Sequence, residues 1–395
     1  MTLRIPIPTL ALALALLAPA AMAAPYIPTS GSDVVERLPR RADPAQRELN
    51  ALRARLTAQP NDLALATGIA QRYIAIGRSE TDPRYLGYAQ AALAPWWSQN
   101  APPVPVRLLR ATLLQSTHHF DEAMRDLDAA VAFEPSNPQA WLTRATVQTV
   151  RGAYRDATAS CARLSSLADE LVTIACVSNV ASLNGHAAQS ERLLDATLRR
   201  AGAVAPELQS WVLTLLAEMA TRRGDAAVAE QRYKSALAVT PRDSYLLGAY
   251  ADFLLDQRRP QDALALVKDQ TRIDALLLRY ALALQQLPGQ QAALRAASDE
   301  LKARFDAAAQ RGDSVHQREH ARYALHLQGD VKSALALARR NWEVQKEPAD
   351  MRVLLEAAVK SGQRDAGAPV TAWLKQNQVE DVVLARLSKQ LAGAA

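Results

Sequence analysis

The sequence predicts an all-α fold of stacked helical hairpins, and the first observation behind this prediction is a repeated spacing. Small residues recur about 34 residues apart, a period typical of helix–turn–helix repeats. Ala111, Ala123 and Ala130 return one step later as Ala145, Ala157 and Leu164. The same offsets are met again further along the chain at Ala217, Ala229, Ala236, Ala251 and Ala263.

Composition and turn residues support the same fold class. Hydrophobic residues make up 49% of the 395 residues and aromatic residues only 5%, so alanine and leucine dominate. This balance favours closely packed helices over a β-sheet. Glycines stand where the chain should reverse between paired helices, at Gly152, Gly185 and Gly224, because glycine tolerates the backbone of a helix C-terminus.

Residues 1–23 are expected to be a signal peptide that is removed after Ala23. Arg4 is followed by the apolar run 10–18, and residues 21–23 form a small-x-small cleavage site. An uncleaved anchor is disfavoured, because the run is shorter than the ~20 apolar residues that span a bilayer. We therefore expect an exported protein, periplasmic in a Gram-negative host, whose mature chain has no membrane-spanning segment.

The remaining chain is expected to fall into four parts. Residues 24–43 are rich in proline, serine and glycine and predict a flexible leader. Residues 44–103 predict an irregular N-terminal repeat or cap. Here the periodicity indicates helices over 45–58, 61–77 and 89–94, with a break at Pro95-Trp96-Trp97. A regular array follows over 104–270, and degenerate repeats with a cap over 271–395.

Two units of the regular array carry a fuller pattern than small residues alone. One combines Trp141, Ala145, Gly152, Tyr154 and Ala157, and the other combines Ala217, Gly224, Ala229, Tyr233, Ala236 and Pro241. With this pattern the chain resembles the tetratricopeptide-repeat (TPR) proteins, most closely over 104–265. The resemblance implies a right-handed superhelical solenoid of about nine hairpins. It also implies a non-enzymatic scaffold that binds another protein, which we connect to cell-envelope assembly or secretion.

In such proteins a concave groove, lined by the first helix of each hairpin, holds an extended peptide or a helix of the partner. The resemblance places seven residues at this groove: Asn179, Trp211, Glu218, Arg222, Tyr245, Asp252 and Tyr323. Aromatic side chains would anchor the partner and polar groups would set its register. Trp211 and Tyr245 can equally be packing residues between repeats. Removing the carboxylates of Glu218 and Asp252 is expected to weaken binding without unfolding the protein.

The two cysteines leave two interpretations open. Cys161 should lie late in the second helix of one hairpin and Cys176 early in the next helix, so a disulfide is sterically allowed. In an oxidising compartment an even pair favours that bond. It would stabilise the fold by about 3 kcal/mol in the chain-entropy model. The alternative is two small buried thiols that never bond.

Histidines near residue 320 suggest a second, different function. His316, Glu319 and His320 match the H-x-x-E-H pattern of one metallopeptidase class, and His326 follows. The alternative to a scaffold is thus a periplasmic metal- or small-ligand-binding protein that uses His316, His320 and His326. The sequence lacks nucleophile, phosphate-loop and dinucleotide motifs, so we expect no enzyme activity and no cofactor. Arginines and acids are interspersed, so the net charge of +6 forms no basic face for nucleic acid.

Overall fold

The computed structural model describes residues 44–80, 82–312 and 315–393. The chain divides into two units, the first ending at Ala51 and the second beginning at Leu52. The predicted signal peptide (1–23) and leader (24–43) lie outside the described residues. The first described helix is α2 (Pro44–Ala58). No strand occurs in the ranges that the structure describes, and no helix there is long and apolar enough to cross a membrane.

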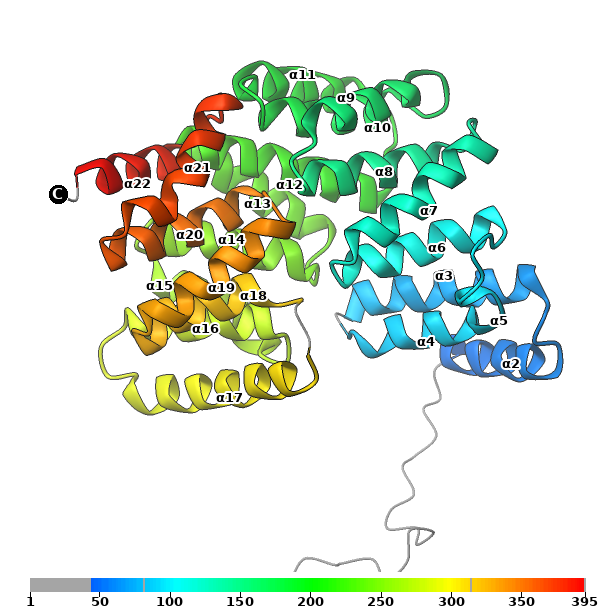
Figure 1. The fold of residues 1–395 in the computed structure, drawn as a ribbon, viewed down its shortest axis with the longest axis horizontal. Coiled ribbons are helices and arrows are strands. Elements are labelled where there is room, and N and C mark those ends of the chain that lie inside the picture. The colour runs from blue at the N-terminus through cyan, green and yellow to red at the C-terminus, as the bar shows by residue number, and fades with distance from the viewer. Residues whose placement is uncertain (1–43, 81, 313–314, 394–395) are drawn as a thin grey trace, which may run out of the picture. The chain divides into compact units, whose positions relative to one another are not determined.

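The second unit is built from helical hairpins that follow one another along the chain (Figure 1). The two helices of a hairpin pack together, and most second helices also pack on the first helix of the next hairpin. Within the described residues there are nine hairpins: α3 (Leu63–Glu80) with α4 (Arg84–Ala92), α6 (Val104–Ser116) with α7 (Phe120–Phe133), α8 (Pro138–Val150) with α9 (Tyr154–Ala162), α10 (Glu170–Ser182) with α11 (Ala187–Arg200), α12 (Pro206–Arg223) with α13 (Ala226–Val239), α14 (Ser244–Asp256) with α15 (Pro260–Val267), α16 (Asp274–Gln285) with α17 (Gln291–Gln310), α18 (Gln317–Tyr323) with α19 (Val331–Val344), and α20 (Pro348–Ser361) with α21 (Arg364–Gln376).

Short elements connect or end these hairpins. The 3₁₀ turns Arg163–Ser166 and Lys268–Gln270 follow α9 and α15, a π-helical turn Ala324–Gln328 follows α18, and α22 (Val382–Gly393) packs on α20. An irregular joint lies at the expected break: α4 ends at Ala92 and α6 begins only at Val104, and between them Ala94–Trp97 forms the four-residue helix α5. Pro95 lies in its first turn, where a missing N–H removes no helical hydrogen bond.

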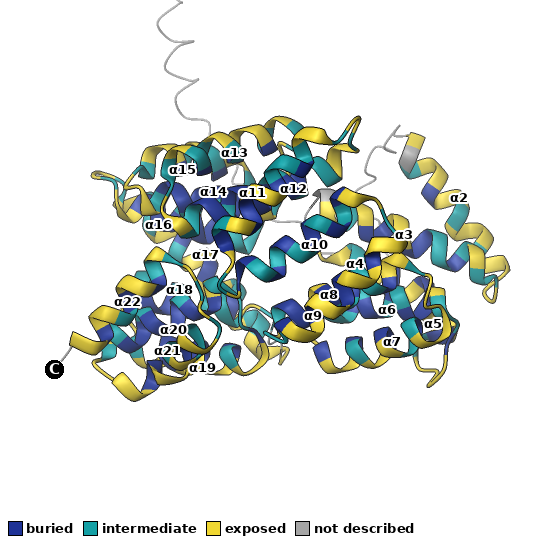
Figure 2. Ribbon diagram, turned by 90° about the horizontal axis from the view of Figure 1, so that it is seen from above, coloured by how far each residue is buried: buried dark blue, intermediate teal, exposed yellow. Residues whose placement is uncertain are grey.

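The predicted small residues lie where helices cross. Ala111, Ala145, Ala217 and Ala251 on first helices are at most 2% exposed. Their counterparts on second helices, Ala123, Ala157, Ala229 and Ala263, are fully buried. Buried residues line the faces on which paired helices meet (Figure 2). The 34-residue spacing therefore marks close backbone contacts, and the predicted all-α solenoid is confirmed.

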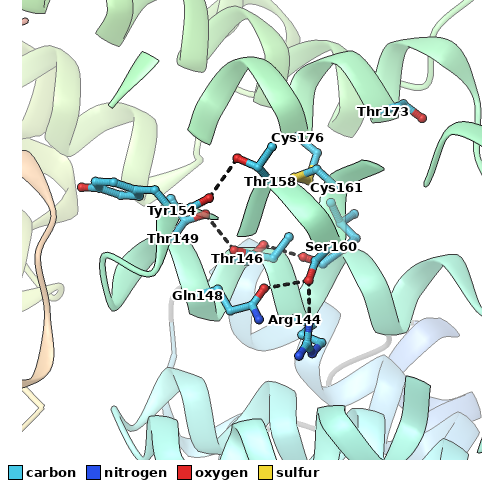
Figure 3. Close-up of a disulfide and its surroundings, with 12 residues drawn as sticks. Arg144, Thr146, Gln148, Thr149, Tyr154, Thr158, Ser160, Cys161, Thr173 and Cys176 are labelled. Atoms are coloured by element: carbon cyan, nitrogen blue, oxygen red, sulfur yellow. Dashed lines mark hydrogen bonds between the residues drawn. A yellow bond between two sulfur atoms is a disulfide. The ribbon is translucent and has the colours of Figure 1, made fainter. Parts of the chain in front are cut away.

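A disulfide joins Cys161 of α9 to Cys176 of α10 (Figure 3). The Sγ atoms are 2.00 Å apart and the Cα atoms 5.5 Å apart. Both residues belong to the buried cluster that contains Tyr154 and Val180. Of the two interpretations that the sequence left open, the structure has the bonded one, which links two consecutive hairpins covalently.

The C-terminal segment returns to the turns of three earlier hairpins. The indole of Trp373 lies against Gly152, the side chain of Gln378 against Gly185, and Val382 against Gly224. The backbone N–H of Lys346 also donates a 2.8 Å hydrogen bond to the carbonyl of Val150. Trp373, Gln378 and Val382 thus lie against the turns of the hairpins α8/α9, α10/α11 and α12/α13, and the Lys346 side chain also lies against Gly152. We call residues 373–382 the returning segment.

Candidate interaction face

Polar side chains on successive first helices contact one another from α10 to α20. Arg222 of α12 donates to the hydroxyl of Ser182 on α10 at 2.8 Å. Tyr245 of α14 donates to Glu218 of α12 at 2.6 Å. We call this series the inner polar row; its members, by helix, are Ser182 (α10), Glu218 and Arg222 (α12), Tyr245, Asp252 and Asp256 (α14), Arg279 (α16), Arg318, Glu319 and Arg322 (α18), and Asp350, Arg352 and Glu356 (α20) with Glu347 at its N-cap.

Tyr245 and Glu218 form the open part of the row. Tyr245 is 60% exposed although it lies on a first helix, and its hydroxyl is held by the Glu218 carboxylate. Burial raises the pKa of Glu218, against the lowering effects of the Tyr245 hydroxyl and the charges of Arg222 and Arg318. An aromatic ring is thus presented to solvent in a fixed orientation.

Asp252 lies at the centre of a buried ion-pair cluster. It accepts hydrogen bonds from Arg279 Nη2 at 2.6 Å and from Arg322 Nη2 at 2.9 Å. The side chains of Arg279 and Arg322 are only 8% and 13% exposed. Burial alone would raise the pKa of Asp252, but the two guanidinium charges outweigh burial and hold that pKa below its ordinary value. Asp252 therefore connects α14 to α16 and α18.

A second charged cluster connects α18 to α20. Arg318 Nη1 lies 3.2 Å from Glu347 Oε2 and 3.3 Å from Asp350 Oδ1. Glu347 and Asp350 also form a reciprocal capping box at the start of α20, which satisfies free backbone N–H groups. Asn341 donates to Asp350 at 2.8 Å. Burial and the neighbouring charge of Asp350, opposed by Arg318, raise the pKa of Glu347 to about 7.

This raised pKa predicts a pH-dependent stability that Glu347→Gln should remove. Between the unfolded pKa of about 4.3 and about 7, the folded protein binds more protons at Glu347, so its contribution to stability falls as pH rises. His320 acts in the opposite direction, since burial lowers its pKa. Because His320 is common to both proteins, its contribution cancels when urea unfolding of the two is compared at pH 5 and pH 8. The remaining difference reports Glu347 together with Asp350, whose pKa is also raised by burial.

Glu347→Gln should gain stability relative to the natural protein between pH 5 and pH 8. Glu347 is 35% exposed, so solvent screening reduces the expected gain to about 1 kcal/mol. If the free energies of unfolding of the two proteins differed by the same amount at pH 5 and at pH 8, Glu347 would not be the source of the pH dependence.

The other predicted groove residues lie in different surroundings. Asn179 is half-buried on α10, and Trp211 is partly buried against the cluster of Leu171 and Leu215. Tyr323 requires a correction, since it is 4% exposed and packs with Phe305. Its hydroxyl donates to the backbone carbonyl of Ser298 at 3.1 Å. An aromatic residue at that helix position fills the core instead of facing a partner.

The three histidines of the alternative function are not gathered into a metal site. His320 stacks on Phe305 with 4.7 Å between ring centroids. His326 Nε2 lies 2.8 Å from a carboxylate oxygen of Glu356. His316 precedes α18. Over the described ranges, no group of three or more histidine, cysteine, aspartate or glutamate side chains is arranged to hold a metal ion.

Sequence reasoning missed Arg318, Glu347, Asp350 and Arg352. Glu347 and Asp350 do form a capping box at the start of α20, but Glu followed by Asp is not the usual sequence signature of that motif. Arg352 carried no local signal: it pairs with Asp256, 96 residues earlier in the chain, at 2.6 Å.

Comparison with known proteins finds likeness only among solved structures. No protein-family model matches the chain, and no curated protein sequence matches it. A tetratricopeptide repeat protein from Parabacteroides merdae has 13% identity and a TM-score of 0.37, covering 73% of this chain and 99% of its own. The TPR domain of P58(IPK) has 13% identity and a TM-score of 0.25, covering 74% and 98%.

Human IFIT1, in its dimer with m7Gppp-AAAA, has 16% identity and a TM-score of 0.37, covering 88% of this chain and 77% of its own. No function follows from these values. The hairpins themselves, with buried alanines at the helix crossings and left-handed glycines at several turns, make the chain an all-α helical-repeat protein.

Proposed function

We propose that this chain is a non-enzymatic scaffold that holds a segment of another protein against Tyr245 and Glu218. The observation that carries the proposal is the exposed ring of Tyr245, whose hydroxyl is already held by Glu218. Aromatic side chains dominate the energetics of many interfaces. A ring with a fixed hydroxyl loses less conformational entropy on binding than a free one.

The polar surroundings favour an extended peptide or a helix that offers both apolar and polar groups. Glu218 and the nearby Arg222 and Arg318 supply charges of both signs beside the ring. A partner segment would cover the ring with an apolar side chain and use the charged groups for register. Asp252 is excluded as a contact in this proposal, since Arg279 and Arg322 already occupy its carboxylate.

Tyr245→Ala tests the proposal. Peptides are selected from a displayed random 12-residue library on the immobilised protein, and their affinities are measured by fluorescence anisotropy. Loss of the aromatic anchor should weaken the best peptide by about tenfold or more. Tyr245→Phe should lower the affinity less than Tyr245→Ala, because the aromatic ring remains.

Phe133→Ala is the matched control, because Phe133 is 72% exposed but ends α7, a second helix. It should change affinity by less than about twofold. The binding site would be refuted if the peptide bound Tyr245→Ala as tightly as the natural protein. It would also be refuted if Phe133→Ala lowered the affinity as much as Tyr245→Ala does.

We also propose that the protein is exported and acts in cell-envelope assembly or secretion. The predicted signal peptide supports export, and the Cys161–Cys176 bond suits an oxidising compartment. N-terminal sequencing of the protein from its native host should begin at Ala24. An N-terminus at or near Met1 would contradict the proposal.

A further inference from the structure

The turns of the hairpins differ in what covers them. Gly152, Gly185 and Gly224 are each contacted by the returning segment. Gly329 and Gly362 occupy the same kind of position, between α18 and α19 and between α20 and α21. Their backbones are left-handed as well, yet no other atom lies within 4 Å of where a Cβ would be. The turns of the last two hairpins are therefore open.

A pocket of about 450 Å³ lies beside these open turns. Val331 and Lys332, which follow Gly329, form part of its wall, and Ser361 and Gln363 flank Gly362 on the other side. Leu335 contributes an apolar floor. The pocket thus spans two consecutive turns, as the returning segment does at Gly152 and Gly185.

Three cationic side chains line this pocket, and no carboxylate does: Lys332, Arg339 and Lys360. The Lys360 ammonium donates to the carbonyl of Leu325 at 3.1 Å, which fixes its position without neutralising its charge. The nearby Asp330 is engaged as the cap of α19, accepting from the backbone N–H of Ser333 at 3.0 Å. Asp330 keeps its charge and interacts electrostatically with Lys332, but it does not line the pocket, whose lining has three cationic side chains and no carboxylate.

We propose that this pocket docks an acidic, extended segment of a partner protein across the turns of the last two hairpins. The returning segment provides the precedent, because the end of α21, the following turn and the start of α22 place Trp373, Gln378 and Val382 against three successive hairpin turns of this chain. Charge complementarity selects an acidic occupant, since carboxylates pair favourably with lysine and arginine. The apolar floor accommodates an aliphatic side chain between the acidic ones.

This surface is separate from the face at Tyr245, so the two proposals can fail independently. No residue of the inner polar row lines the pocket. Binding here requires neither the exposed tyrosine nor Glu218, and Tyr245→Ala should leave it unchanged.

A labelled decapeptide of alternating glutamate and leucine is the probe, and fluorescence anisotropy with the full chain is the measurement. Lys332→Glu combined with Arg339→Glu should weaken its binding by about tenfold or more. The control is Arg155→Glu combined with Arg192→Glu, which makes the same change in net charge on the exposed helices α9 and α11. In that control the affinity for the peptide should fall by less than about threefold.

A photo-crosslinking version of the peptide provides a second readout on the natural protein. Crosslinks mapped by mass spectrometry to residues 331–339 and 360–363 would support the proposal without any variant. Crosslinks elsewhere, or equal losses in the pocket and control variants, would overturn it as nonspecific attraction to a basic protein. If inorganic phosphate displaces the peptide completely at equal molar concentration, the pocket is a small-anion site and the peptide assignment is wrong.

Discussion

Asp252→Ala should lower the free energy of unfolding by about 3 kcal/mol, because it removes the carboxylate that pairs directly with two buried guanidinium groups. Arg279 and Arg322 approach the same carboxylate from α16 and α18. Without it they would repel each other at 8% and 13% exposure. Urea unfolding followed by circular dichroism measures the loss.

Asp128→Ala is the matched control for this prediction. Asp128 also pairs with an arginine, Arg144 at 2.7 Å, but its side chain is 54% exposed. Exposed pairs contribute about 0–1 kcal/mol, so this variant should remain near the natural stability. Adding Arg322→Met to Asp252→Ala should restore part of the loss by removing one unpaired charge. Similar losses in Asp252→Ala and Asp128→Ala would disprove the structural role of Asp252.

The same geometry corrects an expectation from the sequence. The combined removal of the Glu218 and Asp252 carboxylates was expected to affect binding alone. Because Asp252 holds three helices together, the double variant would confuse lost binding with lost folding. Tyr245 and Glu218 are therefore the residues at which binding is to be tested.

Gly152→Ala should cost about 3 kcal/mol, the second large effect. The backbone of Gly152 has φ = 77°, which costs an L-residue about 1–2 kcal/mol. An added Cβ would also lie 2.5 Å from Cζ2 of Trp373. The indole must then move, at a further cost of about 1–3 kcal/mol for overpacking. Thermal and urea unfolding both report the loss.

Gly289→Ala separates the two contributions. Gly289 occupies the equivalent turn between α16 and α17 with φ = 75°, and nothing lies within 4 Å of its Cβ position. This control should lose only the backbone part, about 1–2 kcal/mol. Trp373→Ala introduced into Gly152→Ala should then show coupling in a double-mutant cycle. Equal losses for Gly152→Ala and Gly289→Ala would show that the returning segment exerts no pressure on this turn.

The sequence predicted the hairpins well because their signals are local. Small residues at helix crossings such as Ala145 and Ala229 follow from how closely paired helices approach. Contacts between distant hairpins leave no such period in the sequence. The pairing of Arg352 with Asp256 and the packing of Trp373 on Gly152 depend on how the whole array curves, which no short pattern records.

The candidate face was predicted less well for a related reason. Tyr245 and Tyr323 both lie on first helices, but one is exposed and the other fills the core. The difference depends on whether another helix covers the position. Phe305 of the long helix α17 lies beside Tyr323, whereas Tyr245 remains open. The spacing of residues in the sequence shows on which face of its helix a side chain lies. It does not show whether another helix covers that face.

The returning segment also bears on how the protein unfolds. A repeat array with contacts only between neighbours can lose its end units one at a time. Here Trp373, Gln378 and Val382 attach the last helices to hairpins much nearer the N-terminus. Deleting residues 373–393 should therefore increase hydrogen exchange in α8 and α12 as well as at the new C-terminus. Helices α8 to α22 are therefore expected to unfold in a single cooperative transition. A repeat array of the same length without such returning contacts would unfold from its ends instead.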